Sequence, residues 1–320
     1  MVDVALSKDN IAVNLVFISG LTRSGKALLC PIVSSFSNVE KVNVNFFLEQ
    51  IPFLNYLNSI PDETAIYLLR TGMNMMVYDN AIGRNANFRP DDYTSIWKYR
   101  NPMEYIQRLF QPDGDRVIRQ LDSKKKIIPM MIHNGLWHAE IWFQAFPLLK
   151  LIHMQRDPAE IVYSWMGKEY DEKFFSNIRS STPTYFYDGK LYPYFASGWE
   201  EQYRECHGID RIIHMIYRIR KYHQENYEKL DSNYKQRVLF VRHKSLLTET
   251  EKNLSIITEF LGVNPTDDTA DILAQENCPR DISVEERRTK IKAIKEKASI
   301  ETFELLMDMV DQFESTDLAI

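Results

Sequence analysis

The chain has 320 residues, 44% of them apolar, so it can bury a sizeable core and lies within the size range of one large α/β domain. Its formal net charge of −5 excludes a global basic field that would attract nucleic acid or an anionic membrane, so its basic residues must act locally. Cys30, Cys206 and Cys278 lie far apart and lack metal-ligand spacing, which favours free thiols in a reducing compartment.

The amino-terminal segment MVDVALSKDN lacks the basic region of a secretory signal, and no apolar run approaches the length of a membrane span. We therefore expect a cytoplasmic protein with no membrane span and no nucleic-acid partner. The sequence makes no prediction about the oligomeric state.

The first predicted element is a strand over residues 13–18, followed by the loop Gly20–Lys26 and an apolar stretch at helical spacing. A helix N-terminus that follows such a loop offers unpaired N–H groups and the positive end of the helix dipole to an anion. Gly20 and Gly25 allow close approach of the backbone, and Arg23 and Lys26 add two cations. The stretch predicts a cradle for a phosphate or a sulfate ester.

The same loop fits the pattern G-x-x-x-x-G-K, but Ala27 stands where a nucleoside triphosphatase has the serine or threonine that holds Mg²⁺. This residue argues against a metal-dependent phosphoryl transferase, and we expect no metal. An ordinary glycine-rich turn between a strand and a helix is the alternative interpretation.

The rest of the chain predicts an alternation of strands and helices. Further strands are expected at 42–48, 127–132, 149–155 and 236–242, and helices at 51–59, 62–79, 92–110, 114–123, 136–146, 158–170, 208–231 and 249–261, with a helical remainder. This alternation predicts an α/β fold, a parallel sheet with helices on both faces. Ligands of such sheets bind beyond the carboxyl ends of the strands, which would gather Gly20–Lys26, Glu49, His133 and Arg156 at one edge.

Two stretches leave their structure open. Residues 171–200 are rich in aromatic side chains, prolines and glycines, and predict either a flap or pocket wall or a surface loop anchored by its rings. The charged run EERRTKIKAIKEK near the carboxyl end is typical of a solvated helix face.

Three segments together resemble the sulfotransferase family. GLTRSGKALL resembles the 5′-phosphosulfate loop, LIHMQRDPAEIVYSW resembles the 3′-phosphate motif, and VLFVRHKSLLTETEKNLSIITEFLGV is similar to the strand, turn and helix that end in F-L-G. Their order and separation agree over about residues 12–263. The resemblance implies a P-loop NTPase-like sulfotransferase fold, here one domain over 1–320 with a helical region at 264–320, and a 3′-phosphoadenosine 5′-phosphosulfate (PAPS) co-substrate.

The resemblance also assigns binding residues and shows departures from the family pattern. The 5′-phosphosulfate loop would comprise Thr22, Arg23, Ser24, Gly25, Lys26 and Ala27, and Arg156 and Ser164 would hold the 3′-phosphate. Thr22 replaces the usual proline, Lys26 and Ala27 replace two hydroxyl residues, and His243-Lys244 replaces a tyrosine and a glutamate. The C-terminal R-K-G signature has no clear match, and Arg280, Arg287 and Arg288 are loose candidates for it.

The implied chemistry is transfer of a sulfuryl group to a hydroxyl or amine of a small molecule, a carbohydrate or a lipid. Arg23 and Lys26 would stabilise the charge that develops in the transition state. A general base must take the proton of the acceptor, and His133 and Glu49 both stand where branches of the family place one. His138 and His153 are expected to be structural.

Two other functions stay open on the sequence alone. A P-loop kinase would need Mg²⁺, which Ala27 does not favour. A non-catalytic nucleotide-binding or scaffold protein on the same fold would fit the altered residues Lys26 and Ala27.

Overall fold

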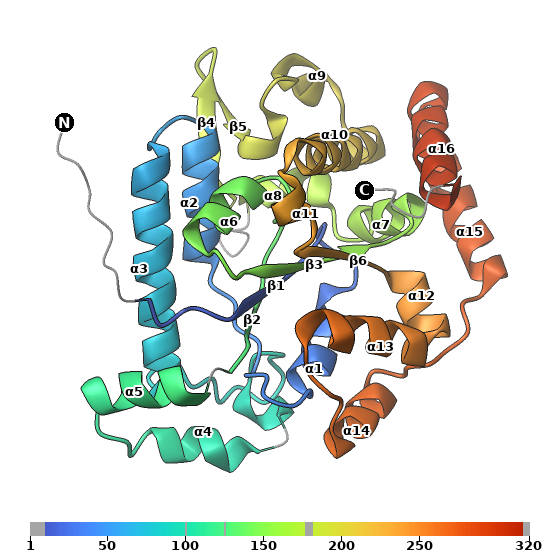
Figure 1. The fold of residues 1–320 in the computed structure, drawn as a ribbon. Helices are drawn as coiled ribbons and strands as arrows, with labels where there is room; N and C mark the ends of the chain where they lie inside the picture. The colour runs from blue at the N-terminus through green and yellow to red at the C-terminus, as the bar shows by residue number, and fades with distance from the viewer. Residues whose placement is uncertain (1–9, 100, 125, 177–181, 316–320) are drawn as a thin grey trace.

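The computed structural model describes residues 10–99, 101–124, 126–176 and 182–315 (Figure 1). In this part of the chain, four parallel strands form the main sheet, in the order β2-β1-β3-β6. Their bounds are Leu15–Ser19 for β1, Ile128–Met131 for β2, Lys150–Gln155 for β3 and Val238–Arg242 for β6. Phe17 of β1 lies opposite Met130 of β2 and Leu151 of β3. The predicted parallel sheet is confirmed, with the first strand in its interior.

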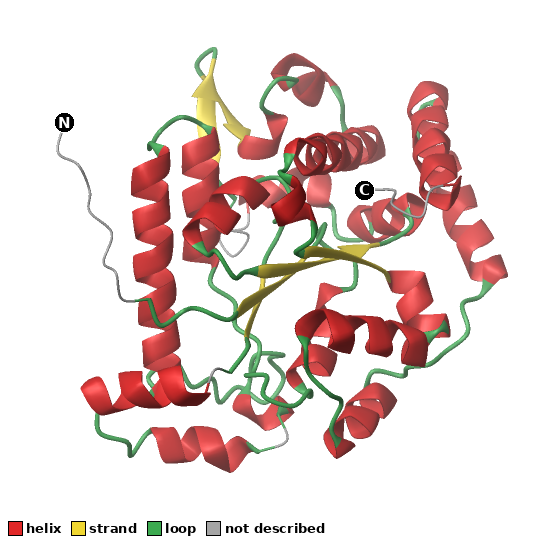
Figure 2. Cartoon of the chain, in the orientation of Figure 1, coloured by secondary structure: helices red, strands yellow, loops and turns green. Residues whose placement is uncertain are grey.

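Helices flank both faces of the sheet (Figure 2). Those before β3 are α1 (Lys26–Ser34), α2 (Phe46–Tyr56), α3 (Asp62–Ala81), α4 (Pro102–Arg108), α5 (Asp115–Lys124) and α6 (Ala139–Ala145). Those after β3 are α7 (Pro158–Met166), α8 (Tyr170–Ser176), α9 (Glu200–Glu205), α10 (Gly208–Lys229), α11 (Ser232–Lys235), α12 (His243–Thr248), α13 (Thr250–Leu261), α14 (Asp267–Gln275), α15 (Val284–Lys295) and α16 (Ile300–Ser315). Across the described ranges, no helix is long and apolar enough to cross a bilayer.

Strand β1 divides its side chains between two hydrophobic clusters because successive residues of a strand point to opposite faces. Leu15 and Phe17 pack with α2, α3 and α6, and the ring of Phe17 meets that of Trp142 edge-on at 4.8 Å. Val16 and Ile18 pack on the other face with α1, α12 and α13. The sheet is therefore buried on both sides, as its continuous apolar strands require.

A third cluster joins the carboxyl-terminal helices to the rest. Trp165 of α7, Ile213 of α10 and Met309 of α16 are buried together in it. The region after residue 263 contains helices, as expected. The grouping of the chain into one domain, with a core over 12–263, stays a prediction.

The strand predicted over 42–48 is wrong. Of these described residues, Asn43 alone forms an isolated parallel bridge, with Met130 of β2, while Val39 before the segment pairs with Ile127 just before β2. Helix α2 begins at Phe46, because the Asn45 side chain accepts a hydrogen bond from the Leu48 N–H and caps it. The alternation of apolar and polar residues in this segment is typical of a strand and did not indicate the cap. The predicted start of the helix at residue 51 is therefore five residues late.

The helix predicted over 92–110 is also wrong in its first half. A 3₁₀ turn covers Ile96–Lys98, and α4 covers only Pro102–Arg108. Asn101 caps α4 through the Glu104 N–H, and Pro102 occupies its first turn. A proline in that position starts a helix and cannot continue one, which explains the break.

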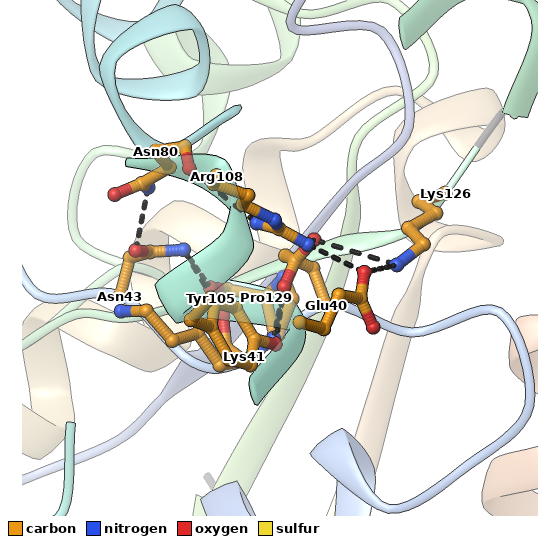
Figure 3. Close-up of polar contacts among 9 residues, drawn as sticks. Glu40, Lys41, Asn43, Asn80, Tyr105, Arg108, Lys126 and Pro129 are labelled. Carbon is orange, nitrogen blue, oxygen red and sulfur yellow. Dashed lines mark hydrogen bonds and ion pairs between the residues drawn. The ribbon is translucent and has the colours of Figure 1, made fainter. Parts of the chain in front are cut away.

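A buried charge cluster holds α4 against the segment between α1 and α2 (Figure 3). Glu40 pairs with Arg108 at 2.9 Å and accepts a hydrogen bond from the Tyr105 hydroxyl. Burial acts to raise the pKa of Glu40, but Arg108, Lys126 and the Tyr105 hydroxyl outweigh it and lower the pKa to about 2. The ionised carboxylate is therefore bound more tightly in the folded chain than its neutral form.

Glu40→Gln should lower the free energy of unfolding by about 3 kcal/mol at pH 7, because it removes the buried charged partner of Arg108 and leaves only the more exposed Glu104. The stabilisation that the Glu40 carboxylate gives to the folded chain is fully present above its unfolded pKa of about 4.5. It declines as the pH falls toward 2. Urea unfolding at pH 7, 5 and 3.5 measures it. The difference in free energy of unfolding between wild type and Glu40→Gln should be smaller at pH 3.5 than at pH 7. Exposed Glu285→Gln should have the wild-type free energy of unfolding at all three pH values. A gap independent of pH would contradict this account.

Candidate functional site

The loop between β1 and α1 turns tightly against β3 and α12. Gly20 and Gly25 have positive φ values of 137° and 107°. A Cβ at Gly20 would lie 2.5 Å from the Met154 carbonyl oxygen, and one at Gly25 would lie 2.5 Å from the His243 ring. Both positions therefore require glycine for conformation and for space. Arg23 also has a positive φ of 72°, which is strained for a residue with a side chain.

Three predicted anion-binding residues meet at this loop. Arg23 Nε donates to Ser164 Oγ at 2.9 Å, and Arg156 Nη1 donates to the Arg23 carbonyl oxygen at 3.0 Å. Arg156 follows β3, and Ser164 lies on α7, which begins two residues later. The carboxyl edges of β1 and β3 thus bring Arg23, Arg156 and Ser164 together, as the topology of a parallel sheet predicts.

The remaining loop residues lie in different environments. Thr22 lines a cavity beside the loop, and its carbonyl oxygen accepts from Trp165 Nε1 at 2.9 Å. Ser24 is buried, and its hydroxyl has no hydrogen-bond partner in the described part of the chain. Ala27 is exposed on the first turn of α1. The loop therefore combines an exposed surface with an unsatisfied buried hydroxyl.

Lys26 points into the protein, beneath its own loop. Its Nζ donates to the Gly20 and Leu21 carbonyl oxygens at 2.7 and 2.8 Å. Burial lowers the pKa of Lys26 to about 8, although the nearby Glu49 carboxylate acts to raise it. The ammonium group thus clamps the start of the loop and places a buried positive charge behind it.

Glu49 and His133, the two candidate bases, contact each other. Glu49 Oε2 accepts from the His133 backbone N–H at 2.6 Å and lies 3.2 Å from His133 Nδ1. Glu49 is buried in the first turn of α2, and the half-buried His133 ring stacks on Phe46. The alternatives left open by the sequence are therefore neighbours in one arrangement, which we call the Glu49–His133 pair.

The Glu49–His133 pair lines a cavity of about 310 Å³ beside the loop. Besides His133, the described part of its wall includes the aromatic residues Phe46, Phe53, Trp165, Tyr170, Tyr194 and Phe195. Asn134 also lines it, donating from Nδ2 to the Tyr194 hydroxyl at 2.7 Å, while its buried Oδ1 has no partner among the described residues. The cavity is within the size range of small-molecule sites.

The aromatic stretch 171–200 is partly a pocket wall and more regular than expected. Pro183, Tyr194 and Phe195 line the cavity, whereas β4 (Thr184–Tyr187) and β5 (Lys190–Pro193) form an antiparallel hairpin with exposed Phe186. Residues 177–181 of this stretch lie outside the described residues. The pocket-wall interpretation is confirmed for its carboxyl-terminal part.

Helix α15 brings further charges to the start of α7, and of these the sequence had offered Arg287 as a loose candidate but not Lys290. Glu160 pairs with Arg156 at 3.0 Å and with Lys290 at 2.9 Å, and Asp157 pairs with Arg287 at 2.6 Å. The purely solvated face predicted for α15 is therefore wrong for Arg287 and Lys290. Their spacing of three residues, which places both on one helix face, was the available signal.

The other two loose candidates, Arg280 and Arg288, form no ion pair with the start of α7 among the described residues. Arg280 Nη1 donates to the Glu276 and Asn277 carbonyl oxygens, and Arg288 is exposed and pairs with Glu285. His243 faces Gly25, and burial together with Arg156 and Arg280 lowers its pKa to about 4. It is therefore neutral near pH 7.

His138 and His153 are the two histidines expected to be structural. Burial lowers the pKa of each to about 3. His153 packs edge-on against His223 inside the protein. Neither is among the residues that line the aromatic cavity.

The arrangement of the loop fits a phosphorylated ligand. Arg156 Nε is buried without a hydrogen-bond partner among the residues described, as is Ser24 Oγ. These unsatisfied groups lie at the end of the sheet where two arginines and a helix N-terminus converge. Anionic oxygens are the acceptors that such donors lack.

Comparison with known proteins agrees with this geometry. Residues 14–302 match the sulfotransferase domain family. No curated protein sequence matches the chain. Among solved structures, the sulfotransferase domain from the curacin biosynthetic pathway is 13% identical, with a TM-score of 0.50, and the alignment covers 93% of this chain and 97% of that one.

Two other sulfotransferases align with lower TM-scores. The sulfotransferase domain of the Synechococcus PCC 7002 olefin synthase is 13% identical (TM-score 0.42, 96% of this chain, 90% of that one). A sulfotransferase from Alicyclobacillus acidocaldarius is 14% identical (TM-score 0.38, 93% and 96%). At such identities a structural match bears on the fold alone, and here the curacin-pathway domain supports the P-loop-like α/β fold. Since the family match covers most of the sequence, the chain belongs to the sulfotransferase domain family.

Proposed function

We propose that this sulfotransferase moves the sulfuryl group of PAPS to a hydroxyl or amine of a small molecule, a carbohydrate or a lipid. One observation carries the proposal. The loop Gly20–Lys26, where Arg23 meets Arg156 and Ser164, lies next to the Glu49–His133 pair, and that pair lines a cavity. Donor, base and acceptor would thus meet at one place.

The proposed donor site uses the loop and the start of α7. Residues Thr22–Ala27 would surround the 5′-phosphosulfate, and Arg156 and Ser164 would hold the 3′-phosphate. When bound, PAPS supplies an activated sulfuryl group whose leaving oxygen belongs to a phosphate. Arg23 carries a fixed charge and a planar set of donors, which suits it to neutralise charge that develops in the transition state.

Lys26 would act differently from its sequence assignment. Two of its N–H groups are occupied by the loop carbonyls, so its main role in the proposal is to fix the loop and to supply background positive charge. This positioning role would replace the hydroxyl residues that the family usually has there.

The Glu49–His133 pair suggests how the acceptor loses its proton. If His133 Nδ1–H donates to Glu49, then His133 Nε2 carries a lone pair and faces away from the carboxylate. His133 would be the base, and Glu49 would hold its tautomer and orientation and stabilise the imidazolium that forms. An acidic residue has the same positioning role in serine hydrolases.

The cavity favours an acceptor with a ring or an acyl chain and a second polar group. Its aromatic wall suits apolar or sugar surfaces, and the unpaired Asn134 Oδ1 suits a hydroxyl or N–H donor. The cytoplasmic location predicted from the sequence belongs to the same proposal and rests on the three free cysteines.

Thermal melts with 3′-phosphoadenosine 5′-phosphate test the donor site. At a hundred times its dissociation constant the nucleotide should stabilise the fold by about 2.7 kcal/mol, with or without EDTA. Arg156→Ala should raise the Kd roughly thirtyfold by removing about 2 kcal/mol of charge-assisted hydrogen bonding. Exposed Arg288→Ala is the matched control and should bind like wild type.

Other results of these melts would support other functions. A shift only with ATP and Mg²⁺ would contradict the proposal and favour a kinase. If neither nucleotide shifts the melting temperature, the result would favour a non-catalytic scaffold.

Steady-state kinetics with an accepted substrate test the base. His133→Gln should lower kcat at least a thousandfold, because it removes the proton acceptor. Glu49→Gln should lower kcat about a hundredfold or more, because its amide N–H stabilises the wrong histidine tautomer. Both should leave the KM for PAPS within a few fold of wild type, and exposed Glu63→Gln should be unchanged. Substantial activity in His133→Gln combined with none in Glu49→Gln would show that Glu49 is the base.

A further inference from the structure

A second cavity, of about 490 Å³, lies at the opposite end of the sheet. It is lined by Asn14 and Ile128, at the starts of β1 and β2, and by side chains of α3, α4 and α5. The loop Gly20–Lys26 follows the other end of β1. A strand of five residues separates the two ends by about 15 Å. This cavity is therefore distinct from the one that the Glu49–His133 pair lines, with which it shares no lining residue.

The cavity lining includes a charged quartet formed by Glu40, Glu104, Arg108 and Lys126. Figure 3 labels three of its members, Glu40, Arg108 and Lys126. Arg108 Nη2 bonds Glu40 Oε2 at 2.9 Å and Glu104 Oε1 at 2.8 Å, and Lys126 Nζ bonds Glu104 Oε1 at 2.9 Å. Two acids and two bases cancel, so the quartet has no net charge. A charged ligand at the quartet would therefore lie as close to a group of its own sign as to a group of the opposite sign.

The outer half of the quartet retains hydrogen-bonding capacity. Glu104 and Lys126 have side chains that are 38% and 28% exposed, in contrast to the buried Glu40 and Arg108. Both partners of Glu104 bond its Oε1, and its Oε2 has no partner within the described ranges. An acceptor oxygen and an ammonium donor therefore stand side by side at the cavity surface.

The rest of the cavity lining combines aliphatic side chains with amides, which are those of Asn14, Asn80, Gln107, Gln111 and Gln120. Among the aliphatic residues, Val77, Val117 and Ile128 are all less than a tenth exposed. Among the described residues that line it there is no aromatic ring, unlike the cavity beside the loop. Burial of an aliphatic group against these walls would release apolar surface from water.

We propose that this cavity is a second small-molecule site, which binds an uncharged ligand with an aliphatic body and an edge that both donates and accepts hydrogen bonds. A carboxamide or lactam has such an edge, with its N–H for Glu104 Oε2 and its carbonyl for Lys126 Nζ. The site does not depend on the proposed donor or base, since its residues take no part in them.

Three matched probes test this site on the full chain. They are cyclohexanecarboxamide, cyclohexanecarboxylate and cyclohexylmethylammonium, which share a ring and differ in charge. Methyl-resolved NMR titrations report where each binds. The carboxamide should shift the methyl signals of Val77, Val117 and Ile128, leave those of Leu21 and Ile219 in the other cavity unchanged, and bind at least fivefold tighter than either charged probe.

Two variants on one helix face locate the binding further. Gln107 lines the cavity from α4, so Gln107→Trp should weaken carboxamide binding at least tenfold. Met103 is exposed on the same helix and lies outside the lining, so Met103→Trp should bind like wild type. The site is overturned if no probe shifts the three methyl signals, or if both variants bind the carboxamide equally.

A charge variant tests the role of the quartet. Glu104→Gln gives the quartet a net charge of +1 while Arg108 keeps Glu40, so the preference should move toward the carboxylate by several fold. Urea unfolding confirms that the variant remains folded. An unchanged preference, or a wild-type preference for either ion, would overturn the assignment of ligand class.

Discussion

The close approach of the β1–α1 turn to β3 and α12 is the constraint on which the site depends. Gly20 and Gly25 leave no room for a Cβ, and Lys26 clamps the turn from below through two carbonyl oxygens. The tight turn holds Arg23 beside Arg156 and Ser164, which come from β3 and α7. The proposed anion site, assembled from three separate segments, therefore depends on packing within one turn.

Glu49 interacts with two different groups near this turn. Glu49 is the buried carboxylate nearest to Lys26, and it is also bonded to the backbone and ring of His133. The acidic residue therefore balances a buried cation on one side and orients an imidazole on the other. Both effects are stronger in a site of low dielectric than in water. A substitution of Glu49 would therefore affect Lys26 and His133 at the same time.

Sequence patterns predicted the sheet and the residues that meet at the β1–α1 turn because local rules and the sheet topology decide them. The apolar strand, two glycines and Arg23 identify the loop, and the carboxyl-edge rule gathers Arg156 and His133 with it. Patterns failed where two local signals compete or where tertiary contacts decide. At Asn45 the local cap competed with a strand-like alternation and started a helix instead. Tertiary contacts bring Lys290 to Glu160, 130 residues away, and join Glu49 to His133 across 84 residues.

The ion pairs of Arg156 have a consequence for how long a nucleotide would stay. Glu160 already occupies Arg156 and Lys290 in the free chain. A bound phosphate would take over these cations, and the carboxylate would recover them as soon as the phosphate left. Binding at this end of the site would then include an exchange of partners at Arg156 Nη2, besides a new hydrogen bond from Arg156 Nε, which has no partner among the described residues. The exchanged part would limit net affinity and shorten residence time, which would favour turnover when release of the spent nucleotide limits the rate.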